Sequence, residues 1–132
     1  MMDEPLWLVR LAVDAMQHEL LSQHGGLRGV RDENALESAL GRPRDKWAYD
    51  SDSDLATLAA AYGFGLARNH AYNDGNKRIA FAAMYTFLGL NDLEIEAPEP
   101  AVVQLMVDVA SGSTSEPELA TWLREHTVPF TQ

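Results

Sequence analysis

The sequence predicts an all-α protein, on three observations. Apolar residues recur at helical spacing in several segments that glycine, proline or aspartate separates. Two of these segments, 55–68 and 79–90, are apolar and follow one another closely, which predicts a central helix pair. Only one short segment, 93–97, alternates as a strand does. The chain of 132 residues has no repeat, linker or low-complexity stretch, so residues 1–132 are expected to form one domain.

The N-terminal third predicts two helices. Apolar residues recur on one helix face over residues 6–23, and the glycine pair 25–26 ends this helix. A second helix is expected after Asp32, a favoured cap, and it is expected to end at Pro43, which cannot continue the hydrogen-bond pattern. The apolar residues within 45–54 have no regular spacing, so this segment is expected to form a loop.

The rest of the chain continues the helical pattern. The segment 55–68 is rich in alanine and glycine, so a neighbouring helix is expected to approach it closely, and that neighbour is 79–90. Residues 93–97 predict a short extended connection. Another helix is expected over 100–110, and the last one is expected to begin at Ser115, before a proline in its first turn.

Composition narrows the possible functions. The net charge of −10 argues against direct binding of nucleic acid, whose affinity depends on cations. The absence of cysteine excludes thiol catalysis and thiolate metal sites. No signal peptide or membrane-spanning run is recognisable, so a cytoplasmic location away from the membrane is expected. The cations gather at 42–46 and at Arg68, Lys77 and Arg78, which indicates one local anion site, although a solvated surface explains 42–46 equally well.

Residues 70–78 interrupt the central helix pair with an imidazole, a carboxylate, amides and two cations. Such a polar loop between apolar helices is typical of a ligand site. Asn73 and Asp74 are favoured cap residues, and Gly75 can adopt the angles that a turn requires. The next helix is therefore expected to begin near Asn76.

The residue types in this loop indicate transfer chemistry. Lys77 and Arg78 oppose the helix dipole by about 0.3–1 kcal/mol each, and a bound phosphate would compensate for that cost. Asp74 is an oxygen ligand of the kind that Mg²⁺ uses together with phosphates. His70 can accept a proton from a hydroxyl near neutral pH. These residues predict a transferase that uses a nucleotide.

Each of these residues also has a structural interpretation. Taken alone, His70 suits a cap or core position, Asp74 an N-cap, and Arg68 the C-terminus of a helix. Their occurrence together at this fixed spacing favours a functional site over separate structural roles. The remaining histidines and the tryptophans are interpreted as surface, cap or packing residues: His18, His24, His126, Trp7, Trp47 and Trp122.

The loop resembles the signature of the Fic/Doc superfamily, and of its Doc branch in particular. The Fic pattern is His-Pro-Phe-x-Asp/Glu-Gly-Asn-Gly-Arg-x-x-Arg, and Doc proteins have lysine in place of its second glycine, as this chain does at Lys77. Segments 25–32, 36–43 and 119–124 are also similar to the family. The resemblance therefore covers nearly the whole chain and implies a compact Fic/Doc helical bundle with a short flap, expected over 42–54.

The resemblance implies roles for individual residues. His70 is expected to deprotonate the target hydroxyl and Asp74 to hold Mg²⁺. The residues expected to bind the ATP phosphates are Asn73, Gly75, Asn76, Lys77 and Arg78, with assistance from Arg68. Fic enzymes that transfer AMP use a small glycine and a second arginine where this chain has Lys77 and Phe81. The resemblance therefore implies that the nucleotide binds in the reverse direction and that the γ-phosphate is transferred.

The resemblance also implies a biological role. Doc proteins are toxins of type II toxin–antitoxin systems that phosphorylate a threonine of elongation factor Tu and stop translation. No inhibitory Ser/Thr-x-x-x-Glu-Gly/Asn motif is present, so a separate Phd-like antitoxin is expected to lay an amphipathic segment in a groove. Two alternatives stay open: AMP transfer at the same site, and a non-catalytic binding module.

Overall fold

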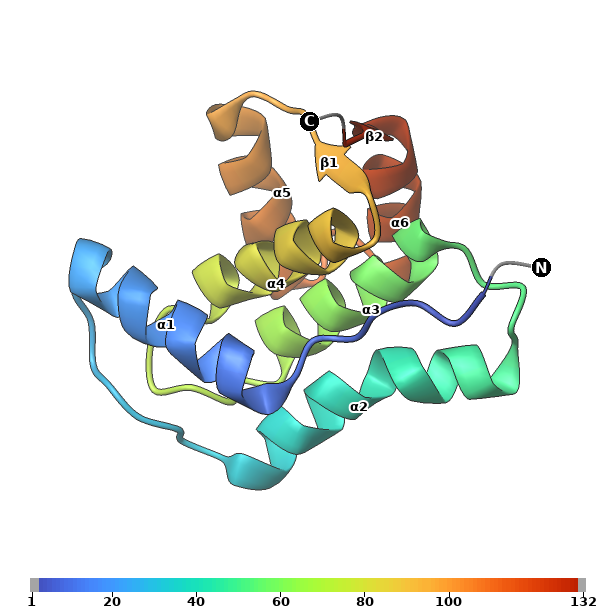
Figure 1. Ribbon diagram of the computed structural model, residues 1–132. Helices are drawn as coiled ribbons and strands as arrows, with labels where there is room; N and C mark the ends of the chain where they lie inside the picture. The colour runs from blue at the N-terminus through green and yellow to red at the C-terminus, as the bar shows by residue number, and fades with distance from the viewer. Residues whose placement is uncertain (1–2, 131–132) are drawn as a thin grey trace.

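The computed structural model describes residues 3–130, and it confirms the all-α class (Figure 1). Its elements in chain order are α1 (Arg10–His24), α2 (Glu33–Tyr49), α3 (Leu55–Arg68), α4 (Asn76–Leu90), β1 (Leu93–Ile95), α5 (Glu99–Ser111), α6 (Glu116–Glu125) and β2 (Thr127–Pro129). Within the described residues the only sheet is the antiparallel pair of β1 and β2. No helix in residues 3–130 combines the length and apolarity that a membrane span requires.

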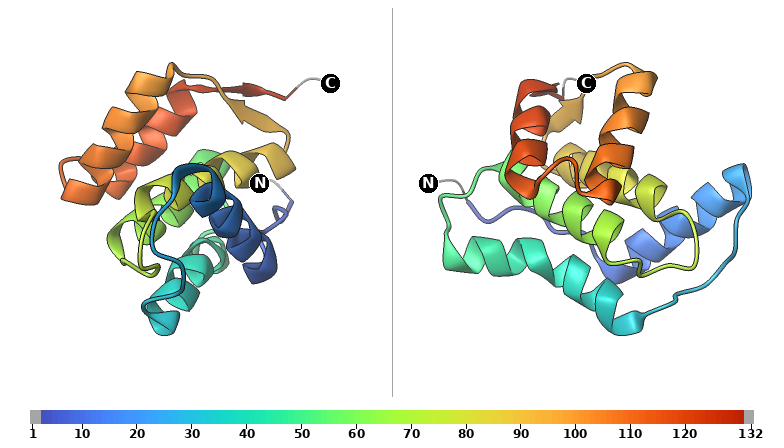
Figure 2. Two further views of the ribbon diagram at one scale, coloured as in Figure 1. Left: turned by 90° about the vertical axis from the view of Figure 1, so that its left-hand side faces the viewer. Right: turned by 180° about the vertical axis from the view of Figure 1, so that it is seen from behind.

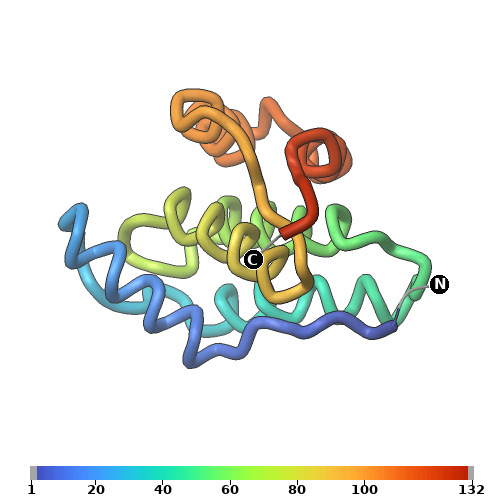
Figure 3. The backbone as a smooth tube through the Cα atoms, turned by 45° about the horizontal axis from the view of Figure 1, so that its top comes forward, coloured from blue at the N-terminus to red at the C-terminus, as the bar shows by residue number. Residues whose placement is uncertain are grey.

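Helices α3 and α4 lie side by side through the middle of the molecule, and the other helices surround them (Figures 1 and 2). On one side α2 packs against α3 and α1 packs against α4. On the other side α5 and α6 both contact α3, and Figure 3 shows these two helices on the side of the molecule opposite α1 and α2. The loop therefore joins the two helices of the fold that contain the most buried residues.

Small residues allow the central helices to approach closely, as predicted. A Cβ atom at Gly63 would lie 2.2 Å from the Met84 sulfur of α4. A Cβ atom at Gly65 would lie 3.3 Å from Ala39 of α2. Larger side chains at these two positions would separate α3 from its neighbours and would shift the loop that follows it.

The first helix begins at Arg10, so the predicted start at Leu6 is wrong. The preceding backbone makes its hydrogen bonds with distant residues instead. Leu8 N–H donates to the hydroxyl oxygen of buried Tyr62 at 3.1 Å, and Leu6 N–H donates to Asn91 Oδ1 at 2.9 Å. These tertiary hydrogen bonds replace the ones that an extra helical turn would supply.

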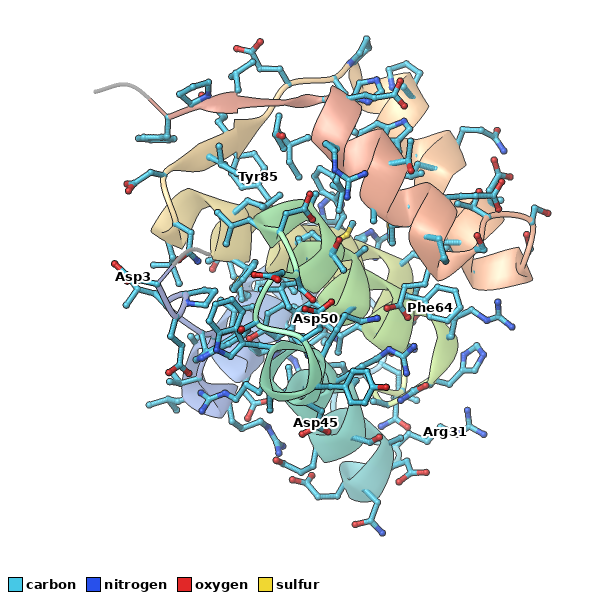
Figure 4. All side chains as sticks on the ribbon, turned by 90° about the vertical axis from the view of Figure 1, so that its right-hand side faces the viewer. Asp3, Arg31, Asp45, Asp50, Phe64 and Tyr85 are labelled. Atoms are coloured by element: carbon cyan, nitrogen blue, oxygen red, sulfur yellow. The ribbon has the colours of Figure 1, made fainter. Side chains whose placement is uncertain are left out.

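Helix α2 continues beyond Pro43, so the loop predicted over 45–54 is wrong for residues 45–49. A proline inside a helix costs about 3 kcal/mol, but the ring of Pro43 is buried and α2 packs along α3. The flap expected over 42–54 is therefore mostly helical. Figure 4 labels two of its residues, of which Asp45 lies within α2 and Asp50 follows its end.

The C-terminal elements follow the sequence prediction closely. Pro100 lies in the first turn of α5, and Ser115 caps α6 in a reciprocal arrangement with Glu118. The predicted extended segment contains β1, which pairs with β2 at the C-terminal end of the chain. The sequence does not predict β2, because three residues are too few to show a period.

Candidate active site

The loop between α3 and α4 borders a cavity of about 300 Å³. All but one of the predicted site residues line it: His70, Asn73, Asp74, Gly75, Asn76, Lys77 and Arg78, together with Ala67 and Ala110. The exception is Arg68, whose guanidinium lies 5.4 Å from the centre of the Phe64 ring (Figure 4) and close to Gly112. The structure therefore gathers the predicted site into one cavity and places Arg68 outside it.

Helix α4 begins at Asn76, as predicted, but its cap differs from the prediction. Gly75 is the N-cap residue, in the left-handed conformation with φ 73°, and no side chain caps the helix. The backbone N–H groups of Asn76, Lys77 and Arg78 have no acceptor among residues 3–130. Three free donors at the positive end of a helix form a site that favours anions.

Asn73 in the loop and Asn76 at the start of α4 use their side chains to hold the loop in shape. Asn76 Nδ2 donates to the Tyr72 carbonyl at 3.0 Å, and Tyr72 N–H donates back to Asn76 Oδ1 at 3.1 Å. Asn73 Nδ2 donates to the Arg28 carbonyl at 3.0 Å. Asn76 therefore offers a ligand its backbone N–H rather than its carboxamide.

The Asp74 carboxylate faces solvent and accepts two backbone hydrogen bonds. Gly75 N–H donates to Oδ1 at 2.9 Å, and Leu27 N–H donates to Oδ2 at 3.2 Å. Gly26 permits this approach, because a Cβ atom there would lie 2.9 Å from Oδ2. A carboxylate has about four acceptor sites, so Asp74 retains capacity for a cation.

A metal ion at Asp74 would need further ligands from outside the protein. No group of three or more His, Cys, Asp or Glu side chains in residues 3–130 is arranged to hold a metal. Mg²⁺ is commonly bound by one or two carboxylates, substrate phosphates and water. The site therefore fits a magnesium ion that arrives with phosphates and does not fit a metal held by protein alone.

His70 has a backbone conformation that is rare for its residue type. Its φ of 51° lies in the left-handed region, which costs a non-glycine residue of the order of 1–3 kcal/mol and is enriched at functional sites. The imidazole is exposed and has no hydrogen-bond partner among residues 3–130. It is therefore free to exchange a proton with a bound group.

The two cation clusters noted in the sequence have different environments. Arg42 Nε lies 3.0 Å from Glu116 Oε1, and Lys46 Nζ lies 3.1 Å from Glu116 Oε2, so these cations tie α2 to α6. Lys77 and Arg78 form no ion pair with any carboxylate of residues 3–130. Of the two clusters, the one at the start of α4 has charge available for a ligand.

The segment between α1 and α2 lies against the loop, a position that the sequence does not predict. Asn73 N–H donates to the Gly29 carbonyl at 3.0 Å, and Arg31 N–H donates to the Ala71 carbonyl at 2.8 Å. Val30 and Tyr72 thereby form an antiparallel bridge. The extended backbone beside the site thus comes from residues 25–32 and not from 42–54.

Helix α1 supports the loop through two polar side chains that were not predicted from the sequence either. The Tyr72 hydroxyl donates to Asp14 Oδ1 at 2.9 Å. Burial and the Asp14 carboxylate raise the pKa of Tyr72, so its hydroxyl stays protonated and donates. Gln17 Nε2 donates to the Asp74 carbonyl at 2.8 Å. The sequence contained one indication of the role of Gln17: it lies four residues after Val13, on the core face of the helix, where a polar side chain is unusual.

Comparison with known proteins assigns the chain to a family. Residues 7–88, which include α1 to α3, the loop and most of α4, match the model of the Fic/DOC family. The chain belongs to this family. This Fic/DOC protein is 34% identical over 110 residues to Protein kinase doc of Escherichia phage P1. The aligned region covers 83% of this chain and 86% of the relative. It is also 45% identical over 74 residues to Toxin Doc of Mycolicibacterium smegmatis, and this aligned region covers 55% of this chain and 57% of the relative. The resemblance to the Doc branch is confirmed.

A second cavity of this Fic/DOC protein, of about 510 Å³, adjoins the first one between α4 and α5. Its lining is mainly apolar and consists of Leu20, Phe81, Ala82, Val102, Val103, Met106 and Val107, with Lys77, Arg78 and Glu99. We call it the α4–α5 groove. Phe81, which stands where Fic AMP transferases have their second arginine, lines this groove and not the loop cavity.

Proposed function

We propose that this Fic/DOC protein is the toxin of a type II toxin–antitoxin system. It acts as an ATP-dependent kinase on a Ser or Thr hydroxyl of a translation factor such as elongation factor Tu. The observation that carries the proposal is the loop cavity, in which an imidazole, two cations and three backbone N–H groups without partners in residues 3–130 meet. The names of the two relatives, Protein kinase doc and Toxin Doc, agree with it.

The proposed reaction is an in-line transfer of one phosphoryl group. The hydroxyl oxygen of the target attacks the γ-phosphorus of ATP while His70 takes the hydroxyl proton. A P–O bond to the target forms, and the bond from the γ-phosphorus to the β–γ bridging oxygen breaks, so that ADP leaves with the electron pair. Lys77, Arg78 and the free N–H groups of α4 stabilise the phosphate charge.

Asp74 is the carboxylate that would hold Mg²⁺, together with phosphate oxygens and water. It is the only carboxylate among the described residues that line the cavity. When bound, the ion neutralises part of the phosphate charge. Gly75 contributes the turn that exposes the N–H groups, and Asn73 and Asn76 keep the loop in place. Arg68 is left out of the proposed phosphate site because it lies outside the cavity.

AMP transfer at the same cavity is the second candidate. The motif of this chain argues against it, because Lys77 stands where AMP transferases need a small residue and Phe81 where they need a cation. The position of Phe81 agrees with this view, since its side chain lines the α4–α5 groove and not the loop cavity. A non-catalytic binding module is the third candidate.

ATP labelled at the α- or the γ-phosphate distinguishes the three candidates. The protein is incubated with purified elongation factor Tu, or with a bacterial extract, and Mg²⁺. Transfer of the γ-label alone supports the kinase. Transfer of the α-label alone supports the AMP transferase, and no transfer supports the binding module.

The variant His70→Ala is expected to lower the rate of γ-label transfer by about 10²–10⁴-fold, the usual contribution of a general base. Because the imidazole is exposed and makes no hydrogen bond within residues 3–130, the thermal unfolding midpoint should not fall. His24→Ala, at an exposed histidine outside the cavity, is the matched control and should retain full activity. Undiminished transfer by the His70 variant would remove this residue from its role.

The α4–α5 groove suits the expected antitoxin. An amphipathic segment of a Phd-like protein would bury apolar side chains against α4 and α5. The groove shares Lys77 and Arg78 with the loop cavity, so its occupant would also reach the phosphate site. This arrangement supports inhibition by direct obstruction of ATP.

The extended segment 25–32 is the better candidate for contact with the protein substrate than 42–54. It lies along the loop that carries His70, whereas most of 42–54 is helical. A target segment added beside Val30 would bring its hydroxyl close to the cavity.

A further inference from the structure

Gln17 has a position that packing alone does not explain. Apart from tyrosines, it is the only polar or charged residue of 3–130 that is buried, with 4% of its surface exposed. Its Oε1 has no hydrogen-bond partner among these residues. It shares the core face of α1 with Val13 and Leu21, where an apolar side chain would avoid the cost of an unpaired buried acceptor.

The hydrogen bond that Gln17 donates replaces a helical one. A helical N–H group bonds to the carbonyl four residues earlier, so the Asp74 carbonyl is the acceptor that Arg78 N–H would use in a longer α4. That carbonyl instead accepts from Gln17 Nε2 at 2.8 Å, and Arg78 N–H has no acceptor among residues 3–130. Asn76 acts in the same way on the Tyr72 carbonyl, which lies four residues before it.

Gln17 also packs against the turn itself. A Cβ atom at Gly75 would lie 3.5 Å from Gln17 Nε2 and 3.7 Å from Gln17 Oε1, so the carboxamide touches the backbone where it turns with φ 73°. One helical turn earlier, Asp14 of α1 accepts from the Tyr72 hydroxyl at 2.9 Å. Helix α1 thus holds the loop on both sides of Asn73.

We propose that Gln17 is a positioning residue for the phosphate site. By occupying the Asp74 carbonyl it keeps the N–H group of Arg78 available to an anion, beside those of Asn76 and Lys77. The identity of this anion as the phosphates of ATP rests on the proposed function. The effect of Gln17 on the backbone does not depend on that function.

The test compares Gln17→Met with the wild-type protein and with Gln23→Met, an exposed glutamine of the same helix. Methionine keeps the length of the side chain and removes the donor together with the unpaired acceptor. We expect MgATP binding, measured by calorimetry, to weaken about tenfold in the Gln17 variant, as is usual when an outer hydrogen bond that orients a binding group is lost. Amide exchange at Arg78 in the ligand-free protein should slow, because the Asp74 carbonyl can then accept that N–H. Gln23→Met should change neither quantity.

A second variant provides a readout that a purely structural role would not give. Gln17→Glu cannot donate to the Asp74 carbonyl when ionised, but it can donate when protonated. As pH falls from 8 to 5 the glutamate gains a proton, whereas the glutamine of the wild type does not titrate. The MgATP affinity of the variant, divided by that of the wild type at the same pH, should therefore recover over this range. A constant ratio across this range would overturn the proposal.

The outcomes for Gln17 and for the proposed function can be told apart. If the wild-type protein does not bind MgATP, the proposed nucleotide site fails, and the Arg78 exchange rates alone decide the role of Gln17. Unchanged Arg78 exchange in Gln17→Met overturns the positioning role in either case. Unchanged MgATP affinity in that variant, with a wild type that binds, also overturns it.

Discussion

At the scale of single residues, the polar groups of the loop divide into two sets with different tasks. The carboxamides of Asn73 and Asn76 bond to backbone carbonyls and fix the loop. The side chains of His70, Lys77 and Arg78 make no such bonds within residues 3–130 and line the cavity. This division explains how a short segment can be rigid and still offer free charge to a ligand.

Lys77 is the residue at which kinase and AMP-transferase chemistry should separate. On the proposed mechanism, Lys77→Gly would remove a charge-assisted contact to phosphate worth about 1.5–3 kcal/mol, so we expect γ-label transfer to fall about 10–100-fold. The same change restores the small residue of the AMP transferases, and α-label transfer should become detectable. The measurement is the pair of labelled-ATP assays described above.

Lys46→Ala is the control for this experiment, because Lys46 is paired with Glu116 and does not line the cavity. It should leave both assays unchanged. A Lys77→Gly protein that transfers the γ-label at the wild-type rate would contradict the reversed orientation of the nucleotide.

At the scale of whole elements, ion pairs hold α6 against the helices beneath it. Glu116 at the start of α6 pairs with Arg42 and Lys46 of α2, and Arg124 in its last turn pairs with Asp54 at 2.8 Å. Asp54 also caps α3 by accepting from Thr57 N–H at 2.8 Å. A hydrogen bond from Arg124, helped by Thr57, lowers the pKa of Asp54 to about 2.

The low pKa of Asp54 predicts a pH-dependent contribution to stability. A carboxylate with a depressed pKa stabilises the fold above its unfolded pKa of about 3.9 and loses this effect as pH falls toward the folded value. Asp54→Asn keeps the cap and removes the ion pair, which is half exposed and therefore worth about 0.5–1 kcal/mol. Urea unfolding at pH 7 should show this loss, and the difference from wild type should shrink between pH 4 and pH 2. A difference that stays constant with pH would show that the charge of Asp54 contributes nothing.

At the scale of the whole molecule, an acidic body carries two adjacent cations at the start of α4, Lys77 and Arg78, that form no ion pair within residues 3–130. The net charge is −10, and Arg10, Arg42, Lys46 and Arg124 are each paired with carboxylates. A small phosphate ligand can reach such a local site, whereas a long nucleic acid would be repelled by the surrounding surface. The adjoining α4–α5 groove gives the same molecule an apolar surface for a protein partner.

The proposed antitoxin surface can be tested in cells. Val103 lines the groove and is 57% exposed, so Val103→Asp should fold normally but bury a charge on complex formation. Expression of this variant should arrest growth as wild type does, while co-expressed Phd-like antitoxin should rescue it at least tenfold less well. Val9→Asp is matched in exposure at 57% but lies outside the groove, and antitoxin should rescue it fully. Equal rescue of both variants would exclude the groove as the antitoxin site.

Much of the fold and of the site could be predicted because the signals lie close together in the chain. The bounds of α3, the start of α4 at Asn76 and the cap of α2 at Asp32 follow from local spacing and capping chemistry. The predictions that failed depended on distant contacts. The helix expected from Leu6 is replaced by hydrogen bonds to residues more than fifty positions away, and packing against α3 carries α2 past Pro43.

The sequence by itself determined the helical class, the polar character of the loop and the family, because each depends on residue types at short and fixed spacing. The tertiary structure alone decided which polar groups are free. It pairs Arg42 and Lys46 with Glu116, places Arg68 over the Phe64 ring, and brings Gln17 to Asp74 across 57 residues. The physical reason is that a charge or an N–H group is available to a ligand only when folding supplies it with no partner, and partners are chosen in space.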